Sequence, residues 1–227
     1  SPINVVDTFA LAKEMNKLDL APSRIDIGKL SAEWLTERKN YKNAEEFIGD
    51  KLRNFIGKEK RKIIPRDVVL YGFGRIGRLL MRELISQAGK GEQLRLRAVV
   101  TRSNSDTDIQ KRADLLRNDS VHGPFPGTVI EDYANKALIV NGHTVYMIAS
   151  SDPSTVDYTS FGINDALLID NTGMARDREG LGKHLKSKGI GKVLLTAPGK
   201  GDIPNVVHGV NETTVNKDER SEEHTSE

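Results

Sequence analysis

Apolar residues between positions 1 and 62 recur at the spacing of amphipathic helices, and no strand pattern occurs before residue 62. The clearest helix is expected to begin at Asn43, with Glu46 in the reciprocal position of a capping box, and to end near Gly57. A second helix, around Trp34, has Ser31 as its expected N-cap. We therefore predict a helical extension over residues 1–62. Its apolar faces suit packing on the main domain, the interpretation we favour, or docking to a partner.

The pattern changes to strands alternating with helices from residue 63 onward. Residues 68–71 form a continuous β-rich apolar run, followed by a glycine-rich turn and by a helix with apolar residues on one face. Residues 94–101 then read as a second strand. Because the connection is long enough for a crossover helix, these segments predict a βαβ unit with parallel strands.

Four more strand signals follow in the second half of the chain. Residues 137–140 and 144–148 flank Asn141-Gly142, a dipeptide that favours a type I′ hairpin turn. Residues 166–170 and 192–196 are short apolar runs typical of buried parallel strands, with a helix expected between them through Leu181 and Leu185.

Composition narrows the choice of function. The 34 basic and 32 acidic residues give a net charge of +2, which argues against binding to nucleic acid or to a membrane surface. No apolar run approaches the ~18 residues of a membrane span, and the N-terminus lacks signal-peptide features, so we expect a soluble, cytoplasmic protein. The sequence contains 0 cysteines, which excludes thiolate metal sites and a cysteine nucleophile from it. The five histidines show no metal-ligand spacing, so we expect no metal site.

A glycine motif lies between the first predicted strand and its helix. Gly72-Phe73-Gly74-Arg75-Ile76-Gly77 fits the G-x-G-x-x-G pattern of dinucleotide-binding proteins. Gly72 permits the tight turn, Gly74 lets the backbone approach a pyrophosphate, and Gly77 lets the helix pack closely on the strand. The sequence thus predicts an α/β fold: a Rossmann-like NAD(P)-binding domain with a mostly parallel sheet over residues 63–219, preceded by the helical N-terminal extension.

Six sequence blocks, in order, resemble the glyceraldehyde-3-phosphate dehydrogenase family. The resemblance runs from about Arg66 to Asn211, and the extension looks like that of a longer bacterial form. The blocks are GFGRIGR (72–78), DSVHG (119–123), SDP (151–153), NTG (171–173), TAPGKG (196–201) and GVN (209–211).

The resemblance implies roles for particular residues in binding the cofactor, NAD or NADP. The backbone of Arg75 and Ile76 is expected to contact the pyrophosphate. Thr172 and Gly173 would lie along the cofactor, and Thr196 beside the nicotinamide-side ribose. Ser151 occupies the place of an adenine-side contact, where many members of the family have Arg.

Arg102 follows the second strand, where the family carries an acidic residue. A carboxylate there binds the adenosine ribose hydroxyls, whereas an Arg forms charge-assisted bonds to a 2′-phosphate. This departure predicts tolerance of NADP, or a preference for it. The alternative is that Arg102 points into solvent while Asp106 or Asp108 supplies the carboxylate.

The family reaction uses a cysteine thiolate and a histidine to pass the aldehyde's hydride to the cofactor before phosphate attack. We expect the parent protein to be a homo-oligomeric, phosphorylating dehydrogenase of glyceraldehyde 3-phosphate. The family's Ser-Cys-Thr-Thr-Asn segment follows GVN, so we expect this chain to stop before the catalytic cysteine and to be inactive. Residues 220–227 resemble a translated DNA-sequencing adapter, and we interpret them as a non-native tail.

Two alternatives to this function stay open. The chain could be a non-catalytic module that binds a dinucleotide or an RNA segment without hydride transfer. The parent could also be a related dehydrogenase of another sugar phosphate, such as an erythrose-4-phosphate dehydrogenase. A downstream cysteine would separate the enzymes from the module.

Overall fold

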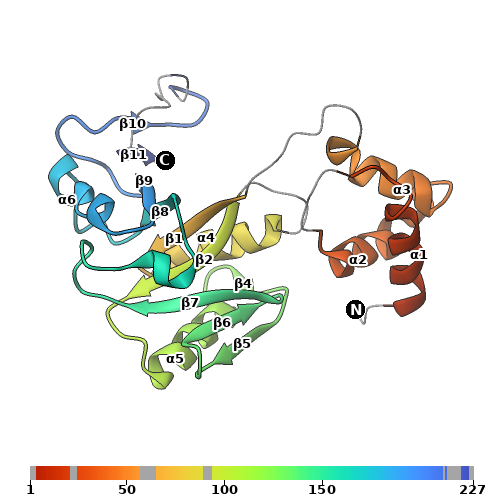
Figure 1. Cartoon of the computed structure of the whole chain (residues 1–227), viewed down its shortest axis with the longest axis horizontal. Coiled ribbons are helices and arrows are strands. Elements are labelled where there is room, and N and C mark those ends of the chain that lie inside the picture. The colour runs from red at the N-terminus through yellow and green to blue at the C-terminus, as the bar shows by residue number, and fades with distance from the viewer. Residues whose placement is uncertain are drawn as a thin grey trace. The chain divides into compact units, whose positions relative to one another are not determined.

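The computed structural model describes residues 4–20, 25–56, 65–88, 94–211, 213 and 221–224. The chain divides into two compact units, one comprising residues 1–65 and 87–93 and the other residues 66–86 and 94–227 (Figure 1). The domain boundary expected between residues 62 and 63 lies outside the described residues, as does Gly57.

The first unit is a small helical cluster. Its core contains Leu11, Phe47 and Ile48, all fully buried, and the Trp34 ring lies 5.1 Å from that of Phe47. The helices are α1 (Val5–Met15), α2 (Ile27–Glu37) and α3 (Ala44–Lys51), with 3-10 turns η1 (Arg38–Asn40) and η2 (Arg53–Phe55).

The N-cap predicted at Asn43 is confirmed, because its side chain accepts a hydrogen bond from the Glu46 amide at 2.9 Å. The reciprocal contact is shifted by one residue: the Glu46 carboxylate accepts from the amide of Lys42 at 2.7 Å. The helix also ends earlier than expected, at Lys51. The local sequence therefore indicates the start of α3 better than its end.

The N-cap predicted at Ser31 is wrong. The N-cap of helix α2 is Asp26, five residues earlier, and its carboxylate accepts from the amide of Lys29 at 3.0 Å. Ser31 is buried inside the helix, with its hydroxyl 3.0 Å from that of Thr8 in α1. The serine therefore joins two helices instead of beginning one.

The second unit is built on one large sheet in the order β10-β11-β9-β8-β1-β2-β7-β6-β5. Neighbouring strands from β10 to β7 are parallel, and β7, β6 and β5 are antiparallel. This confirms the α/β, Rossmann-like fold with a mostly parallel sheet. The strands are β1 (Arg66–Tyr71), β2 (Leu94–Thr101), β5 (Val129–Asp132), β6 (Ala137–Val140), β7 (His143–Ala149), β8 (Ala166–Asp170), β9 (Ile190–Leu195), β10 (Asn205–Val206) and β11 (Ser221–His224).

Short helices connect these strands and cover the sheet. They are α4 (Arg75–Gln87), α5 (Asp106–Arg117) and α6 (Arg178–Gly182), with 3-10 turns η3 (Tyr158–Phe161) and η4 (His184–Lys186). A separate two-stranded sheet pairs β3 (Asn118–Asp119) with β4 (Gly123–Pro124). The single helix predicted through Leu181 and Leu185 is thus two short ones, α6 and η4.

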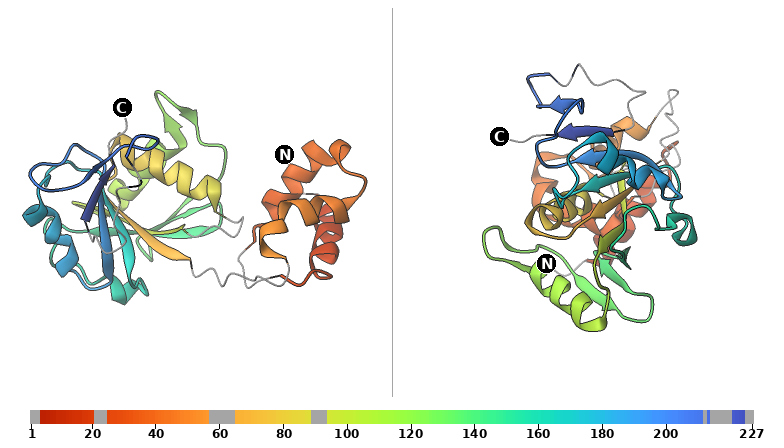
Figure 2. Two further views of the ribbon diagram at one scale, coloured as in Figure 1. Left: turned by 90° about the horizontal axis from the view of Figure 1, so that it is seen from above. Right: turned by 90° about the vertical axis from the view of Figure 1, so that its left-hand side faces the viewer.

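Side chains of β1 alternate between the two faces of the sheet. Val68 and Leu70 pack into a core that includes residues of α4 and α5, whereas Val69 packs into a second core with Leu181 and Tyr158. Figure 2 shows α4, in yellow, lying along one face of the sheet. Because both faces are covered, the apolar run of β1 is continuous instead of alternating.

The Asn141-Gly142 turn has the geometry that its sequence predicts. Asn141 has φ of 48° and Gly142 φ of 78°, both in the left-handed region that a type I′ turn requires. The turn joins β6 to β7 as an antiparallel pair.

Residues 221–224 form β11, which pairs with β9 on one side and β10 on the other. Strand pairing uses backbone groups that nearly every residue carries, so it is independent of the origin of this segment. The interpretation of residues 220–227 as a non-native tail stays a prediction.

Candidate cofactor-binding site

A cleft of about 870 Å³ opens at the carboxyl ends of the parallel strands. Its lining comes mainly from segments at the strand ends: residues 71–74 at β1, 100–102 at β2, 150–153 after β7, and Asp170, Thr172, Met174 and Ala175 at β8. Helix α5 and the region of α6 and η4 complete it with Arg112, Gly180, Lys183 and His184. The strand order reverses at β1, which lies between β2 and β8. This switch point is where open α/β sheets bind their ligands, and the volume suits a small-molecule cofactor.

The glycine turn after β1 forms one wall of the cleft, and its three glycines differ in the space around them. Gly72 has φ of 95°, a conformation that favours glycine. A Cβ on Gly77 would lie 2.5 Å from the Gly72 carbonyl oxygen, so the helix can approach the turn only without a side chain. A Cβ on Gly74 would meet no atom within 4 Å. Gly74 therefore leaves open space beside the backbone, as a bound pyrophosphate requires.

Helix α4 begins directly after this turn. Its first hydrogen bond runs from the Arg78 amide to the Gly74 carbonyl at 3.1 Å. The preceding amides have no partner within the helix, and they carry the positive end of its dipole. The open space at Gly74 and the helix N-terminus together fit the phosphates of a dinucleotide.

The eleven residues predicted to bind cofactor do not all reach the cleft. Those that line it are Gly72, Phe73, Gly74, Arg102, Ser151 and Thr172. Those outside its lining are Arg75, Ile76, Gly77, Gly173 and Thr196. Of the latter, Thr196 is half-buried, and its hydroxyl lies 3.2 Å from the Asp170 carbonyl oxygen and 3.2 Å from Asn171 Oδ1. Their individual roles stay predictions.

A buried pair at the floor of the cleft is missing from the sequence-based prediction. His184 Nε2 lies 3.0 Å from Asp170 Oδ2, and both side chains are almost fully buried. The other oxygen of Asp170 accepts from the amide and the hydroxyl of Thr172, both at 2.7 Å. An ionised carboxylate only accepts hydrogen bonds, so His184 donates through Nε2. The pair thereby fixes the loop that carries Thr172.

The sequence points in hindsight to Asp170 of this pair, but not to His184. Asp170 ends an apolar run predicted as a buried strand, and the carboxyl ends of parallel strands are where ligand sites form. His184 carries no such signal, because its spacing on a short helix looks like that of a surface residue. Burial against Tyr71, with ring centroids 4.6 Å apart, becomes visible only in the fold.

Arg102 lines the cleft, whereas Asp106 and Asp108 do not. Asp106 forms an ion pair with Lys136 at 2.7 Å. Asp108 accepts hydrogen bonds from the hydroxyls of Ser103 and Ser105, and these bonds hold the pKa of its carboxyl below the usual range. Both carboxylates are therefore engaged outside the cleft.

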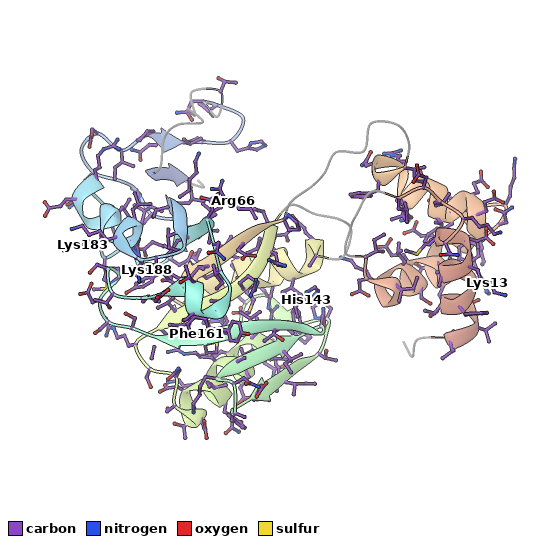
Figure 3. The ribbon with its side chains drawn as sticks, viewed as in Figure 1. Lys13, Arg66, His143, Phe161, Lys183 and Lys188 are labelled. Carbon is purple, nitrogen blue, oxygen red and sulfur yellow. The ribbon has the colours of Figure 1, made fainter. Side chains whose placement is uncertain are left out.

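Arg112, on α5, is a further cationic residue of the cleft that the sequence-based prediction missed. It is half-buried, and its buried Nε has no hydrogen-bond partner among the described residues. Burial lowers the pKa of its guanidinium, opposed by the charge of Asp108. Lys183, labelled in Figure 3, follows α6 and also lines the cleft.

Within the described ranges, no group of three or more His, Cys, Asp or Glu side chains is arranged to hold a metal ion. A search of the same residues finds no helix with the length and apolarity needed to cross a membrane.

The chain is similar to proteins of one family. Residues 66–178 match the family model described as "Glyceraldehyde 3-phosphate dehydrogenase, NAD binding domain". A "Glyceraldehyde-3-phosphate dehydrogenase-like protein" of Pseudomonas aeruginosa is 49% identical over 219 residues, 96% of this chain and 47% of that protein. That match is long enough to include most of the helical extension.

Two further relatives match a smaller share of the chain. The "Glyceraldehyde-3-phosphate dehydrogenase" of Thermotoga maritima is 39% identical over 70% of the chain and 43% of its own length. The "Glyceraldehyde-3-phosphate dehydrogenase A, chloroplastic" of Zea mays is 38% identical over 67% of the chain and 36% of its own length. The chain thus spans less than half the length of each of these relatives.

The sheet, the glycine turn and these similarities agree with one another. The cleft is that of an NAD(P)-binding domain, and the chain belongs to the glyceraldehyde-3-phosphate dehydrogenase family.

Proposed function

We propose that this chain is the cofactor-binding part of a phosphorylating glyceraldehyde-3-phosphate dehydrogenase. The observation that carries the proposal is the cleft at the switch point, where an open glycine backbone and a helix N-terminus meet. The boundaries belong to the proposal: a helical extension over residues 1–62, a cofactor domain over 63–219 and a foreign tail over 220–227.

In this proposal the cofactor accepts a hydride from the aldehyde substrate, and the residues described here bind and orient it. The backbone at Gly74 and the first amides of α4 hold the pyrophosphate. Asp170 and His184 keep Thr172 at the edge of the cleft, so that the cofactor meets a fixed wall. The sequence contains no cysteine, so the thiol step falls to a part of the parent protein that it does not include.

Binding of NAD to the 227-residue chain tests the cofactor part of the proposal. Isothermal titration calorimetry is expected to give one site per chain. The Gly74→Ser variant, which adds a side chain to the open backbone, is expected to bind about tenfold more weakly or worse. A chain that is folded but binds neither NAD nor NADP would refute the proposal.

The enzymatic part requires the complete coding sequence. We expect the reading frame to continue beyond Asn211 into a segment with a cysteine, and its product to form NADH or NADPH from glyceraldehyde 3-phosphate only when inorganic phosphate is present. Faster turnover of erythrose 4-phosphate would favour the related dehydrogenase. A frame that ends without a cysteine would leave the non-catalytic dinucleotide-binding module.

A further inference from the structure

Arg112 occupies a costly position, and among the described residues only the charge of Asp108 compensates its guanidinium. A half-buried guanidinium loses hydration, and a buried N–H without a partner loses a hydrogen bond. Neither an ion pair nor a hydrogen bond joins Arg112 to the rest of the part that the structure describes, and the buried Nε has none. A cation held in this way inside a ligand cleft indicates a binding role, because an anionic ligand would supply the missing partner.

The lining of the cleft contains a second arginine. Arg102 directly follows β2, its side chain is exposed, and it lines the cleft with Arg112. The two residues come from consecutive elements, the end of β2 and the helix α5 that follows it. Two guanidinium groups in one cleft repel each other unless an anion lies between or beside them.

The nearby acidic residues bind other groups directly, although the charge of Asp108 also acts on Arg112. Asp106 binds Lys136, and Asp108 binds the hydroxyls of Ser103 and Ser105. Asp152 does line the cleft, but one of its oxygens accepts from the amide and hydroxyl of Ser154 at 2.9 and 2.7 Å.

The place of the two arginines in the fold identifies the ligand group. In a dinucleotide bound to the glycine turn after β1, the adenosine ribose lies at the end of β2. A carboxylate at this point would favour a free 2′-hydroxyl and repel a phosphate, whereas arginine binds phosphate through paired, charge-assisted hydrogen bonds. We infer that Arg102 and Arg112 together form a site for the 2′-phosphate of NADP. The inference rests on the proposed function, since it requires the dinucleotide to occupy this cleft.

Two small ligands isolate the 2′-phosphate. 5′-AMP and adenosine 2′,5′-bisphosphate differ only in that group, and both are titrated into the full 227-residue chain by calorimetry, beside NAD and NADP. The wild-type chain is expected to bind the bisphosphate about 10–100-fold more tightly than 5′-AMP, the effect of one to two charge-assisted bonds. A ratio close to one would overturn the inference.

Variants then assign the effect to the arginines. Arg112→Met keeps an unbranched apolar stem and removes the charge, so it is expected to lower the bisphosphate preference about tenfold and to leave 5′-AMP binding within about twofold. Arg102→Gln is expected to act in the same direction. Lys111→Met is the matched control, because Lys111 neighbours Arg112 on α5 but does not line this cleft.

The remaining outcomes separate the two proposals. An equal loss of affinity for 5′-AMP and for the bisphosphate in Arg112→Met would mean that Arg112 positions the adenosine itself, and would overturn the 2′-phosphate assignment. If the wild-type chain binds NAD but prefers it to NADP, the inference fails and the proposed function stands. If it binds no dinucleotide at all, both fail. If Arg112→Met does not fold, Arg112→Lys replaces it, because lysine keeps the charge but loses the paired hydrogen bonds of arginine. The inference is then tested by the bisphosphate preference of this variant and of the wild-type chain.

Discussion

The close approach of α4 to the glycine turn makes Gly77 a sharp test of the fold. An alanine at an interior helix position normally stabilises a helix by up to about 1 kcal/mol relative to glycine. Here the added Cβ would lie 2.5 Å from the Gly72 carbonyl oxygen and 3.4 Å from its carbonyl carbon, both backbone atoms that cannot rotate away. The helix or the turn has to move.

Overpacking of this kind costs about 1–3 kcal/mol, and the short contact with backbone places Gly77→Ala toward the upper end. After subtraction of the helix propensity gained, the free energy of unfolding should fall by about 1–2 kcal/mol. For a domain of this size that corresponds to a Tm lower by about 2–8 °C, measured by circular dichroism or scanning calorimetry.

Gly74→Ser supplies the contrast, since a Cβ there meets no atom and serine is a favourable residue before a helix. Its stability should change by less than about 0.5 kcal/mol, while its dinucleotide affinity falls. A Gly77→Ala variant as stable as the wild type, or more so, would refute the close approach of α4 to the turn.

Three further predictions concern stability. His184→Ala leaves a buried oxygen of Asp170 without its partner and should lower the free energy of unfolding by about 1.5–3 kcal/mol in urea titrations, whereas a change below about 0.5 kcal/mol would contradict the pairing. The amide of Val121 and the side chain of His122 hold the pKa of Asp119 well below its usual range, so its stabilisation is present above about pH 4 and lost as the pH falls below that value. Asp119→Asn should therefore be less stable than the wild type at pH 7, with a gap that narrows at pH 3; a constant gap would contradict the assignment. Gly142→Ala forces a left-handed φ on alanine and should cost about 1–2 kcal/mol in thermal unfolding, and an unchanged Tm would argue against the turn.

The sequence indicates six strands of the second unit, β1, β2, β6, β7, β8 and β9, because each is a short apolar run bounded by turn residues. It does not indicate β3, β4, β5, β10 or β11, which are four residues long or shorter. Residues 94–101 and 166–170 agree with β2 and β8 in full. The hairpin at Asn141-Gly142 is equally clear, since few other dipeptides adopt its backbone conformation. Local sequence is therefore enough to predict a strand or a turn where burial on both faces of the sheet, or a positive φ, restricts the residue types.

Contacts between distant segments could not be predicted in the same way. Ser31 resembles an N-cap locally, yet its neighbour is Thr8 on another helix. His184 looks like a surface residue of a short helix, and Arg112 lies on α5, a helix that the sequence patterns above do not indicate. Only the packing of α5 and η4 beside the strand ends brings these two residues to the cleft. Residue type and spacing describe one element at a time, whereas the site depends on how several elements meet.

The strand order also determines when the cofactor site can form. Val68 of β1 pairs with Leu96 of β2 and with Leu167 of β8, so the central strand has one early and one late neighbour along the chain. During synthesis β1, α4 and β2 can associate first, but the wall carrying Asp170 and Thr172 is made only about 70 residues after β2 ends. Until then the edge of β1 that pairs with β8 has unpaired backbone groups that another chain could bind. The cleft also lacks the wall that β8 supplies. Dinucleotide binding should therefore be absent from nascent chains that end before β8 and should appear only once that strand has joined the sheet.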